Sequence, residues 1–533
     1  MTLPVLLNLT GHSSAAVCPS CSSMNSRILC RGLNGLCRTL YSGELKRFTS
    51  PCDVGSIQND HLITILDRNA YTEYGRKYGF SRIRSYREFA ENVPLTAYED
   101  YEEHIQRIAD GENNVLTAEA VKLLEPTSGS SGGRKLIPYT ASLQREFQRG
   151  IRPWIGDIYS HVPGVMSGSS YWSVTPVTSG KQFTPSGIPI GFEEDSAYFG
   201  RLEKHIMDRI FAVDSSVKFS GSMESFWYNT AVQLLNCPCL SLVSVWNPTY
   251  LSILCRYISD NALSLAKEIP AGKRYTFLRY ARSGRFNLVF PELRIISCWA
   301  DGCAADSVGE VQSLFPGVYI QPKGIIATEC FTSFPLVGES GSRLSIFSHF
   351  FEFRSIKDGS VVTACGLVPG EYEIIVTTGG GLYRYCIGDI IQVIEVFPDA
   401  PPLVRFLRRA GAACDLFGEK LTEDFVRNVL SKLCIVDKFC LLAPEGNRYC
   451  LYTEDVNISG EQLDAALCES FHYSYCRQLG QLGCAVVVHA SPDAKIQYLK
   501  RLTDDGMRLG DIKPSCLSRK SGWGKYLTLE RNT

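Results

Sequence analysis

The 533-residue sequence lacks an imbalance of charge, because 54 Lys and Arg residues face 55 Asp and Glu residues, for a formal net charge of -1. A protein that grips nucleic acid or an anionic membrane usually carries an excess of basic residues, so we expect neither partner. No apolar stretch approaches the roughly 20 residues of a membrane-spanning helix, and the first residues lack the basic start of a signal peptide. We therefore expect a cytoplasmic protein that acts on small molecules.

Histidine is also scarce, with eight residues in the whole chain, and none stands in a recognisable catalytic triad motif. His349 and His472 lie among aromatic residues, where a packed, hydrogen-bonded ring is the usual arrangement. The sequence thus offers no clear general base for a serine or cysteine nucleophile.

Cysteine is abundant, but its count of 21 is odd and the residues are scattered through apolar segments. This distribution is typical of reduced thiols that pack as small apolar side chains. The nearest approach to a metal pattern is Cys18-x-x-Cys21, followed by Cys30 and Cys37. That stretch lacks suitably spaced His ligands, and its second pair has the wrong spacing, so free thiols are favoured over a zinc site.

The length and a hydrophobic share of 45% are ordinary for a globular protein of at least two domains. Runs rich in β-formers alternate with helical patterns, which predicts an α/β architecture with at least one largely parallel sheet. The predicted strands are 121–124, 136–139, 171–174, 231–235, 240–245, 294–299, 371–376 and 390–396, and the predicted helices include 61–78, 98–109 and 142–152.

The stretch from Glu125 to Tyr139 combines glycines, serines and Thr127 with a basic pair, Arg134 and Lys135. Glycines allow the backbone to approach an anion, and hydroxyl groups add donors, so the pattern is typical of a phosphate-binding loop. It is not a Walker A motif, because Leu136 follows the lysine. Two alternatives remain open from these residues alone: a flexible connector, and a G-x-S-x-G elbow with Ser131 as nucleophile.

Further candidates for a nucleotide site lie downstream. Thr328 and Glu329 follow an apolar run, and we expect them to project from the end of a strand into a ligand crevice. Tyr383 and Tyr385 alternate before a Gly-Asp pair and are expected on one strand face, with Asp389 able to accept ribose hydroxyls. Each of these signals alone is also compatible with an ordinary strand end or loop.

Five motifs in order resemble the Gretchen Hagen (auxin-responsive promoter) family of acyl-acid amido synthetases, in a form closer to microbial members than to the plant hormone enzymes. The upstream segments Val93-Pro-Leu-x-x-Tyr-Glu-Asp-Tyr101 and Tyr171-Trp-Ser-Val-Thr-Pro176 also fit, so the resemblance extends over about residues 50–518. The five motifs are the phosphate loop, Ala327-Thr-Glu329, Thr377-Thr-Gly-Gly-Gly-Leu-Tyr-Arg-Tyr-x-Ile-Gly-Asp389, Phe417-Gly-Glu-Lys-Leu-Thr-Glu423 and Leu509-Gly-Asp-Ile-Lys-Pro514.

The resemblance implies an adenylate-forming fold of the ANL superfamily. It implies an N-terminal adenylation domain over 1–417, a hinge at 418–420 and a small α+β C-terminal domain over 421–533. It also implies a reaction in which a carboxylic acid attacks ATP to give an acyl-adenylate and pyrophosphate, after which an amine or amino acid displaces AMP. The remaining alternatives are an acyl-CoA-type ligase and a non-catalytic nucleotide-binding homologue.

The resemblance assigns roles residue by residue. Glu329 is the expected Mg²⁺ ligand beside Thr328, Asp389 the ribose-binding acid, and Tyr383 its aromatic neighbour. Lys420, at the hinge, and Lys513, in the late motif, are the expected catalytic lysines. The expected ATP-binding loop comprises Thr127, Ser128, Gly129, Ser130, Ser131, Gly132, Gly133 and Lys135.

The sequence departs from the family pattern at Arg408, where relatives usually carry glycine, and at Cys386, where they tend to carry a charged or polar residue. Neither change removes a proposed catalytic group, but Arg408 is expected to affect ATP affinity or hinge geometry. The expected lining of the acyl pocket is apolar, although each residue is also compatible with an ordinary core. Its members are Trp172, Val174, Trp246 and Phe334.

Overall fold

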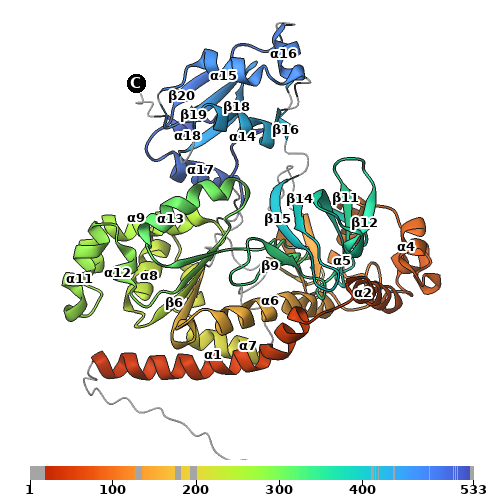
Figure 1. The fold of residues 1–533 in the computed structure, drawn as a ribbon, viewed down its shortest axis with the longest axis horizontal. Coiled ribbons are helices and arrows are strands. Elements are labelled where there is room, and N and C mark those ends of the chain that lie inside the picture. The colour runs from red at the N-terminus through yellow and green to blue at the C-terminus, as the bar shows by residue number, and fades with distance from the viewer. Residues whose placement is uncertain are drawn as a thin grey trace, which may run out of the picture.

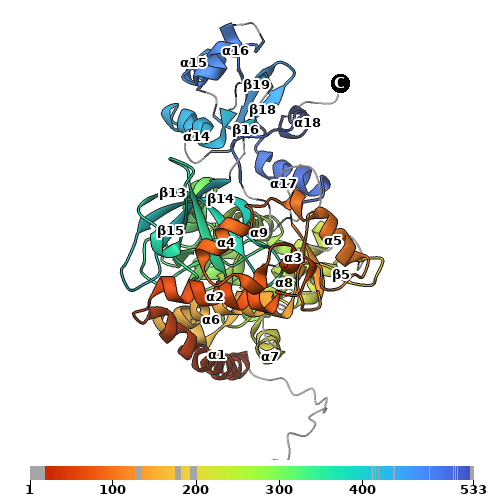
Figure 2. The same cartoon turned by 90° about the vertical axis from the view of Figure 1, so that its right-hand side faces the viewer.

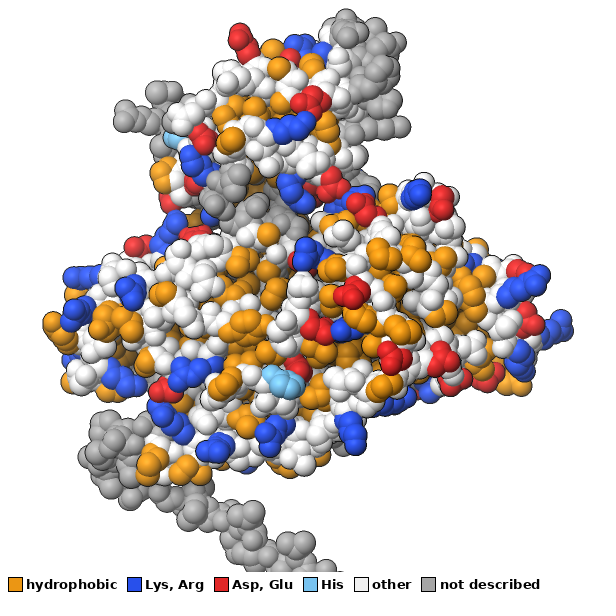
Figure 3. All heavy atoms as spheres, viewed as in Figure 1, with side chains coloured by type: hydrophobic (Ala, Val, Ile, Leu, Met, Phe, Trp, Pro, Cys, Tyr) orange, Lys and Arg blue, Asp and Glu red, His pale blue; other side chains and the backbone are white. Residues whose placement is uncertain are grey.

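The computed structural model has a large main part and a smaller C-terminal part (Figure 1). On the face shown in Figure 3, side chains of both charges are spread among apolar ones. No helix in the described part of the chain has the length and apolar character needed to cross a membrane. The structure describes residues 19–127, 135–173, 182–191, 201–409, 413–414, 416–417, 419, 421–435, 438–455, 457–478, 481–507, 509, 512 and 514–528.

Helices at the base and side of the main part cover its sheets (Figures 1 and 2). The predicted helix 61–78 is wrong as a single element, because the helix stops at Arg68 and a new one begins after Thr72. The Thr72 hydroxyl accepts from the Gly75 backbone N–H at 2.9 Å and so caps the second helix. These helices are α1 (Pro19–Thr49), α2 (Val54–Arg68), α3 (Glu73–Lys77), α4 (Tyr86–Asn92), α5 (Glu102–Ala109), α6 (Ala141–His161) and α7 (Arg201–Ile210).

A seven-stranded antiparallel sheet forms one half of the main part, in the order β12-β11-β13-β14-β15-β10-β9. The strands predicted at 371–376 and 390–396 correspond to β13 and to the second half of β14. Helices α2 and α6 pack near this sheet, and their apolar faces join its inner face in the largest core cluster. The strands are β9 (Ser333–Pro335), β10 (Ser342–Leu344), β11 (Phe350–Ser355), β12 (Val361–Thr363), β13 (Gly370–Thr377), β14 (Tyr385–Glu395) and β15 (Leu403–Arg409).

The other half of the main part contains a parallel sheet in the order β3-β6-β7-β8, which confirms the predicted α/β class. The strand predicted at 231–235 is wrong: these residues belong to α8, whose Ala231, Leu234 and Leu235 share one buried helix face. Short apolar runs fit either element. The elements are β3 (Ser169–Trp172), α8 (Met223–Asn236), β6 (Leu240–Ser244), α9 (Pro248–Asp260), α11 (Ala271–Arg282), β7 (Ile295–Cys298), α13 (Val308–Leu314) and β8 (Tyr319–Pro322).

A smaller sheet carries the two ends of the predicted phosphate loop. Strand β1 (Leu123–Thr127) pairs antiparallel with β2 (Lys135–Tyr139), and Thr127 lies directly opposite Lys135. The parallel partner of β1 is β5 (Pro189–Ile190), which in turn pairs with β4 (Gln182–Phe183). The two strands therefore deliver both ends of the loop to one place.

The C-terminal part has its own three-stranded sheet, β18-β19-β20, and two apolar clusters of its own. Its contacts with the main part include an ion pair between Lys495 and Glu310 at 3.4 Å. Its elements are β16 (Ala413–Cys414), β17 (Leu421–Thr422), α14 (Glu423–Lys432), β18 (Cys440–Glu445), β19 (Arg448–Thr453), α15 (Gly460–Leu467), α16 (Phe471–Gln478), β20 (Val486–His489), α17 (Ala494–Asp504) and α18 (Gly524–Leu527).

Candidate active site

Two acidic residues from distant stretches meet beside an arginine. Glu329 lies at the tip of a tight turn, in which the Ala327 N–H donates to the Cys330 carbonyl at 2.9 Å. Asp389 lies within β14, where Arg409 of β15 is its direct cross-strand partner and donates through Nε to Oδ1 at 3.2 Å. The two acids are only 5% and 2% exposed. Because Glu329 interacts with the charges of both Asp389 and Arg409, the two predicted carboxylates belong to one buried, charged cluster.

The position of Glu329 differs in detail from the expectation of a strand end. Strand β8 stops at Pro322, and the only pairing around Glu329 in the described chain is an isolated bridge between Ile326 and Phe331. Thr328 and Glu329 thus lie in a turn, with Thr328 partly buried and Glu329 buried.

The electrostatics of the cluster couple four residues. Burial raises the pKa of Glu329 above its ordinary value, and the nearby charge of Asp389 adds to this rise, while Arg409 and Lys135 oppose it. Arg409 has a raised pKa because the attraction of Asp389 and Glu329 outweighs the cost of its burial. Lys135, at the end of the phosphate loop, therefore lies within electrostatic reach of Glu329.

The cluster fits a magnesium ion that is shared with phosphates. Mg²⁺ commonly takes one or two protein carboxylates and completes its shell with waters and substrate phosphates. Among the residues that the structure describes, no group of three or more His, Cys, Asp or Glu could hold a metal by itself. Glu329 is a buried carboxylate whose ionised form a cation would stabilise, so it suits this shared mode of binding.

A buried hydrogen-bond chain fixes the backbone around the cluster. The two Glu146 carboxylate oxygens accept from the Gly379 N–H at 3.0 Å, and Glu146 also pairs with His349 Nδ1 at 2.9 Å. His349 Nε2 accepts from the Phe331 N–H at 2.9 Å. His349 thus bridges the glycine-rich loop and the Glu329 turn, and the expectation that it is a packed, hydrogen-bonded ring is confirmed.

The upstream Val93–Tyr101 motif braces the Tyr-Arg-Tyr segment. The Tyr101 hydroxyl accepts from the Tyr383 N–H and donates to the Tyr383 carbonyl, both at 2.8 Å. Arg384 is buried, bonds Glu352 at 2.8 Å and donates to the Val93 carbonyl at 2.7 Å. The residues of the upstream motif therefore have a structural role, because they hold the backbone and side chains of the Tyr-Arg-Tyr segment in place.

The expectation that Tyr383 and Tyr385 share a strand face is wrong. Arg384 between them has φ +49, which breaks the strand alternation, and β14 begins only at Tyr385. The Tyr383 ring is fully buried, stacks on Tyr74 at 5.0 Å and donates its hydroxyl to the Leu116 carbonyl at 2.7 Å. Tyr385, whose pKa is raised first by burial and then by Glu329, is the tyrosine of this motif beside the acids.

Aromatic residues predicted for the acyl pocket divide into two groups. Trp172 ends β3 and Trp246 follows β6, so both lie at the carboxyl edge of the parallel sheet. Phe334 lies instead in the middle of β9, fully buried at 4.4 Å from the Phe48 ring. Its expected place in the pocket is wrong for this structure, because the strand turns its ring into the core.

The late motif reaches the same sheet edge. Asn247, which follows Trp246, donates through Nδ2 to the Ile512 carbonyl at 3.1 Å, and Ile512 is fully buried. Leu509 packs against the apolar cluster under this sheet. The C-terminal part therefore brings the neighbours of Lys513 to the parallel sheet.

Sequence reasoning missed Arg409, Asn247 and Lys323 as residues of this region. Arg409 carried a signal, because it follows directly after Arg408, the position at which the sequence departs from the family pattern. Asn247 and Lys323 follow strands of the parallel sheet, and position after a strand was the one signal that could have identified them. Several predicted site residues lie outside the described part of the chain: Ser128, Gly129, Ser130, Ser131, Gly132, Gly133, Val174, Lys420 and Lys513.

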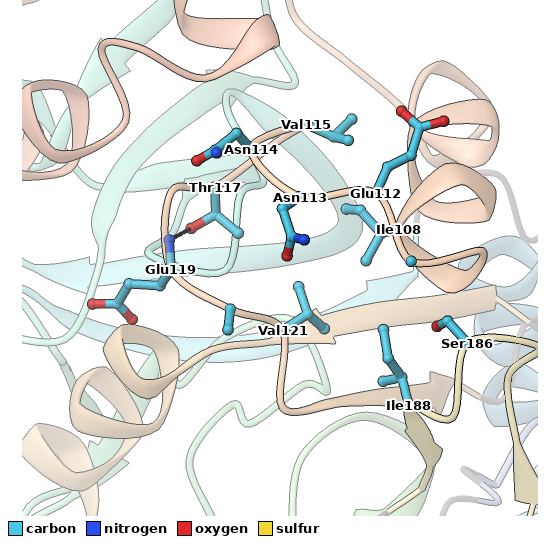
Figure 4. Close-up of a pocket in the computed structure, with 12 residues that line it drawn as sticks. Ile108, Glu112, Asn113, Asn114, Val115, Thr117, Glu119, Val121, Ser186 and Ile188 are labelled. Carbon is cyan, nitrogen blue, oxygen red and sulfur yellow. Dashed lines mark hydrogen bonds between the residues drawn. The ribbon is translucent and has the colours of Figure 1, made fainter.

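A separate cavity of about 220 Å³ lies between α5, the loop that follows it, and the 182–191 segment. Figure 4 shows Ile108, Val121 and Ile188 at its apolar side and Asn113 pointing inward. None of the predicted site residues lines this cavity, and we do not assign it to the site.

Comparison with known proteins identifies the family. A model described as the GH3 family N-terminal domain matches residues 43–278, and one described as the GH3 family central domain matches residues 343–409, together more than half of the chain. The chain belongs to the GH3 family. The rice protein GH3.10 (Oryza sativa subsp. japonica), whose name describes an indole-3-acetic acid-amido synthetase, is 26% identical over 428 residues, which cover 75% of this GH3 chain and 87% of the relative.

Solved structures show the same fold as this GH3 chain. AtGH3.15, an acyl acid amido synthetase in complex with 2,4-DB, has a TM-score of 0.77 at 19% identity, covering 92% of this chain and 95% of that one. A 2-hydroxyisobutyryl-CoA ligase in the postadenylation state has a TM-score of 0.54 at 13% identity, covering 84% and 88%. The adenylate-forming fold expected from the motifs is therefore confirmed.

Proposed function

We propose that this GH3 protein is an ATP-dependent acyl-acid amido synthetase. A carboxylate oxygen attacks the α-phosphorus of ATP and releases pyrophosphate, which gives an acyl-adenylate. The nitrogen of an amine or amino acid then attacks the acyl carbon, loses a proton and displaces AMP. The observation that best supports this function is one charged cluster formed by residues from four separate stretches of the chain. Its members are Glu329, Asp389, Arg409 and Lys135.

Each member of the cluster has a distinct role in this proposal. Asp389 accepts the ribose hydroxyls, and Glu329 holds the Mg²⁺ that accompanies the triphosphate. Arg409 and Lys135 face negative charge on the phosphates, while the loop from Thr127 to Lys135 supplies backbone donors. Magnesium, when bound, neutralises charge on the phosphate oxygens. The protein otherwise works by positioning the acid for in-line attack and by excluding water.

The C-terminal part supplies the second half of the proposal. We place the hinge at residues 418–420, between domains of 1–417 and 421–533, with Lys420 reaching the phosphates. The Asn247 side chain bonds the Ile512 carbonyl. Because Lys513 directly follows Ile512 in the sequence, this bond supports a role for Lys513 at the main part. We also propose a cytoplasmic location, which is compatible with described cysteines that form no disulfide with one another.

The two departures from the family pattern do not count against catalysis. Arg408 bonds Glu371 at 2.9 Å and Asp424 at 2.7 Å, so its side chain is engaged away from Asp389. Cys386 is held through its backbone N–H by the Thr96 carbonyl at 2.9 Å. Neither side chain has a described bond to the carboxylate cluster, and the non-catalytic alternative therefore gains nothing from them.

Acid-dependent exchange of pyrophosphate into ATP tests the first half-reaction. We expect the wild type to exchange with some members of a broad acid panel, and Asp389→Ala and Glu329→Ala each to lower the rate by about 10²–10³-fold, a typical loss for a preorganised polar group. Lys135→Ala is expected to lose less, since backbone donors remain. Asp60→Ala, which removes an exposed carboxylate on α2, is the matched control.

The outcome separates the alternatives. If Asp389→Ala and Glu329→Ala both exchange pyrophosphate at the wild-type rate, the site assignment is wrong. If the wild type exchanges with no carboxylic acid of the panel, a non-catalytic binding protein is favoured. Mass spectrometry of products formed with amino acids or with CoA then distinguishes the amide from the thioester.

A further inference from the structure

The four parallel strands end in three tryptophans and a lysine. Trp172 ends β3, Trp246 follows β6, Trp299 follows β7, and Lys323 follows β8 directly. Backbone bonds continue past the strands, since the Trp299 N–H donates to the Trp246 carbonyl at 2.8 Å and the Lys323 N–H donates to the Cys298 carbonyl at 2.7 Å. The four side chains are therefore displayed along one rigid edge, at the place where ligands bind in open α/β sheets.

The lysine ammonium lies among the aromatic faces. Lys323 is only 4% exposed, and its Nζ donates to the Val245 carbonyl at 2.9 Å. Nζ is 4.3 Å from the centre of the Trp246 ring and 6.0 Å from that of Trp172, while Trp246 and Trp299 lie 5.6 Å apart. Aromatic faces stabilise a desolvated cation. The tryptophans themselves are half-buried and keep exposed surface at this edge.

This edge is also where the C-terminal part arrives, because Asn247, the neighbour of Trp246, holds the Ile512 carbonyl. A ligand at the tryptophans is thus adjacent to the segment proposed to carry Lys513. The edge therefore suits a substrate group that stays bound through both half-reactions.

We propose that Lys323, with Trp172, Trp246 and Trp299, forms a subsite for a carboxylate carried on an apolar body, distinct from the carboxylate that is activated. The inference deepens the proposed function and rests on it. The activated carboxylate loses its charge when the acyl-adenylate forms, so its attraction to the Lys323 ammonium would end at the first step. A second carboxylate keeps its charge throughout.

Two sources share this chemistry. One is a second acidic group on the acyl substrate, and the other is the α-carboxylate of an amino acid acceptor. Both present an anion beside apolar surface, which the ammonium and the indole rings complement.

Matched ligand pairs distinguish the sources. Phenylsuccinate against phenylacetate tests the acid in pyrophosphate exchange, and phenylalanine against phenethylamine tests the acceptor in amide formation. In one of the two pairs, we expect the carboxylate-bearing member to have a KM at least tenfold lower in the wild type. Lys323→Met should abolish that ratio by raising the KM of the carboxylate-bearing member, and Lys323→Arg should retain part of it.

A binding measurement separates this subsite from the overall reaction. Titration of intrinsic tryptophan fluorescence without ATP should show quenching by the preferred ligand that Lys323→Met loses, even if no turnover is found. Lys323→Gln provides a second neutral variant in case the methionine variant does not fold. Unchanged ratios in both pairs, or an equal loss for all four ligands, would overturn the subsite while leaving the exchange result intact.

Discussion

Glu329 illustrates a residue that is placed for chemistry at a cost to stability. Its carboxylate is almost fully buried, and burial together with Asp389 raises its pKa above the ordinary 4.5. Burying a charge is unfavourable unless partners compensate, and here Arg409 and Lys135 compensate only in part. A cation bound together with ATP would offset the remaining free-energy cost of burying the charge of Glu329.

This cost predicts a pH-dependent effect of Glu329→Gln. Below pH 4.5, Glu329 is protonated in both the folded and the unfolded protein and does not destabilise the fold. Because its pKa is raised in the folded protein, the free energy of unfolding falls as pH rises through that raised pKa. The neutral glutamine avoids this loss. We therefore expect Glu329→Gln to melt at a higher temperature than the wild type at pH 8, with the difference closing towards pH 4.

Thermal melts across this range provide the measurement, with exposed Asp60→Asn as the control that should show no such trend. A glutamine variant that is less stable than the wild type at pH 8 would contradict the assigned cost.

At the level of elements, the glycine-rich turn after β13 owes its shape to α6. Thr140, the N-cap of α6, accepts from the Leu143 N–H at 3.1 Å and donates to the Gly379 carbonyl at 2.8 Å. Glu146, two turns later, accepts from the Gly379 N–H. A β-carbon at Gly379 would lie 2.5 Å from Glu146 Oε1 and 2.7 Å from Ser142 Cβ. Only glycine permits this approach of the turn to the helix.

Gly379→Ala should therefore destabilise the protein by about 1–3 kcal/mol, the usual cost of overpacking a well-filled site. It should also lower exchange, because Glu146 connects through His349 to the backbone of the Glu329 turn. Denaturant unfolding measures the first effect. Gly272→Ala, near the start of α11 where nothing lies within 4 Å of an added β-carbon, is the matched control and should be neutral or slightly stabilising.

How far the sequence predicted these elements depended on the kind of signal. Glycine and hydroxyl patterns predicted a phosphate-binding loop, and the structure brings its two ends together in the pair of β1 and β2. The apolar run at 231–235 was ambiguous, and tertiary packing made it helical. The family resemblance predicted that Glu329 and Asp389 belong to one site. The position of Arg409 beside Asp389, and of Lys323 over the Trp246 ring, depends on strand neighbours that are distant in sequence.

At the scale of the whole molecule, the two parts are joined by few polar contacts that the structure describes, and Arg408 makes one of them. Its Nε lies 2.7 Å from Asp424 of α14, and its Nη1 lies 2.9 Å from Glu371 of β13. Burial raises the pKa of Asp424, against the attraction of Arg408 and Arg427. Arg408 of β15 thus ties the first helix of the C-terminal part to the antiparallel sheet.

We expect this tie to hold the parts in the arrangement of Figure 1, so Arg408→Gly and Asp424→Asn should each loosen it. Because the pair is partly exposed, its coupling in a double-mutant cycle should be about 0.5–1 kcal/mol, and high salt should weaken it.

Small-angle X-ray scattering should show the wild type shifting towards the variants as salt rises, and the variants staying unchanged. Arg427→Gln, which removes a partner of Asp424 within α14, leaves the connection to β15 in place and should scatter as the wild type does. Identical scattering from wild type and Arg408→Gly at low salt would mean that the bond does not restrain the parts, and that the other contacts, at Lys495 and Asn247, set their arrangement.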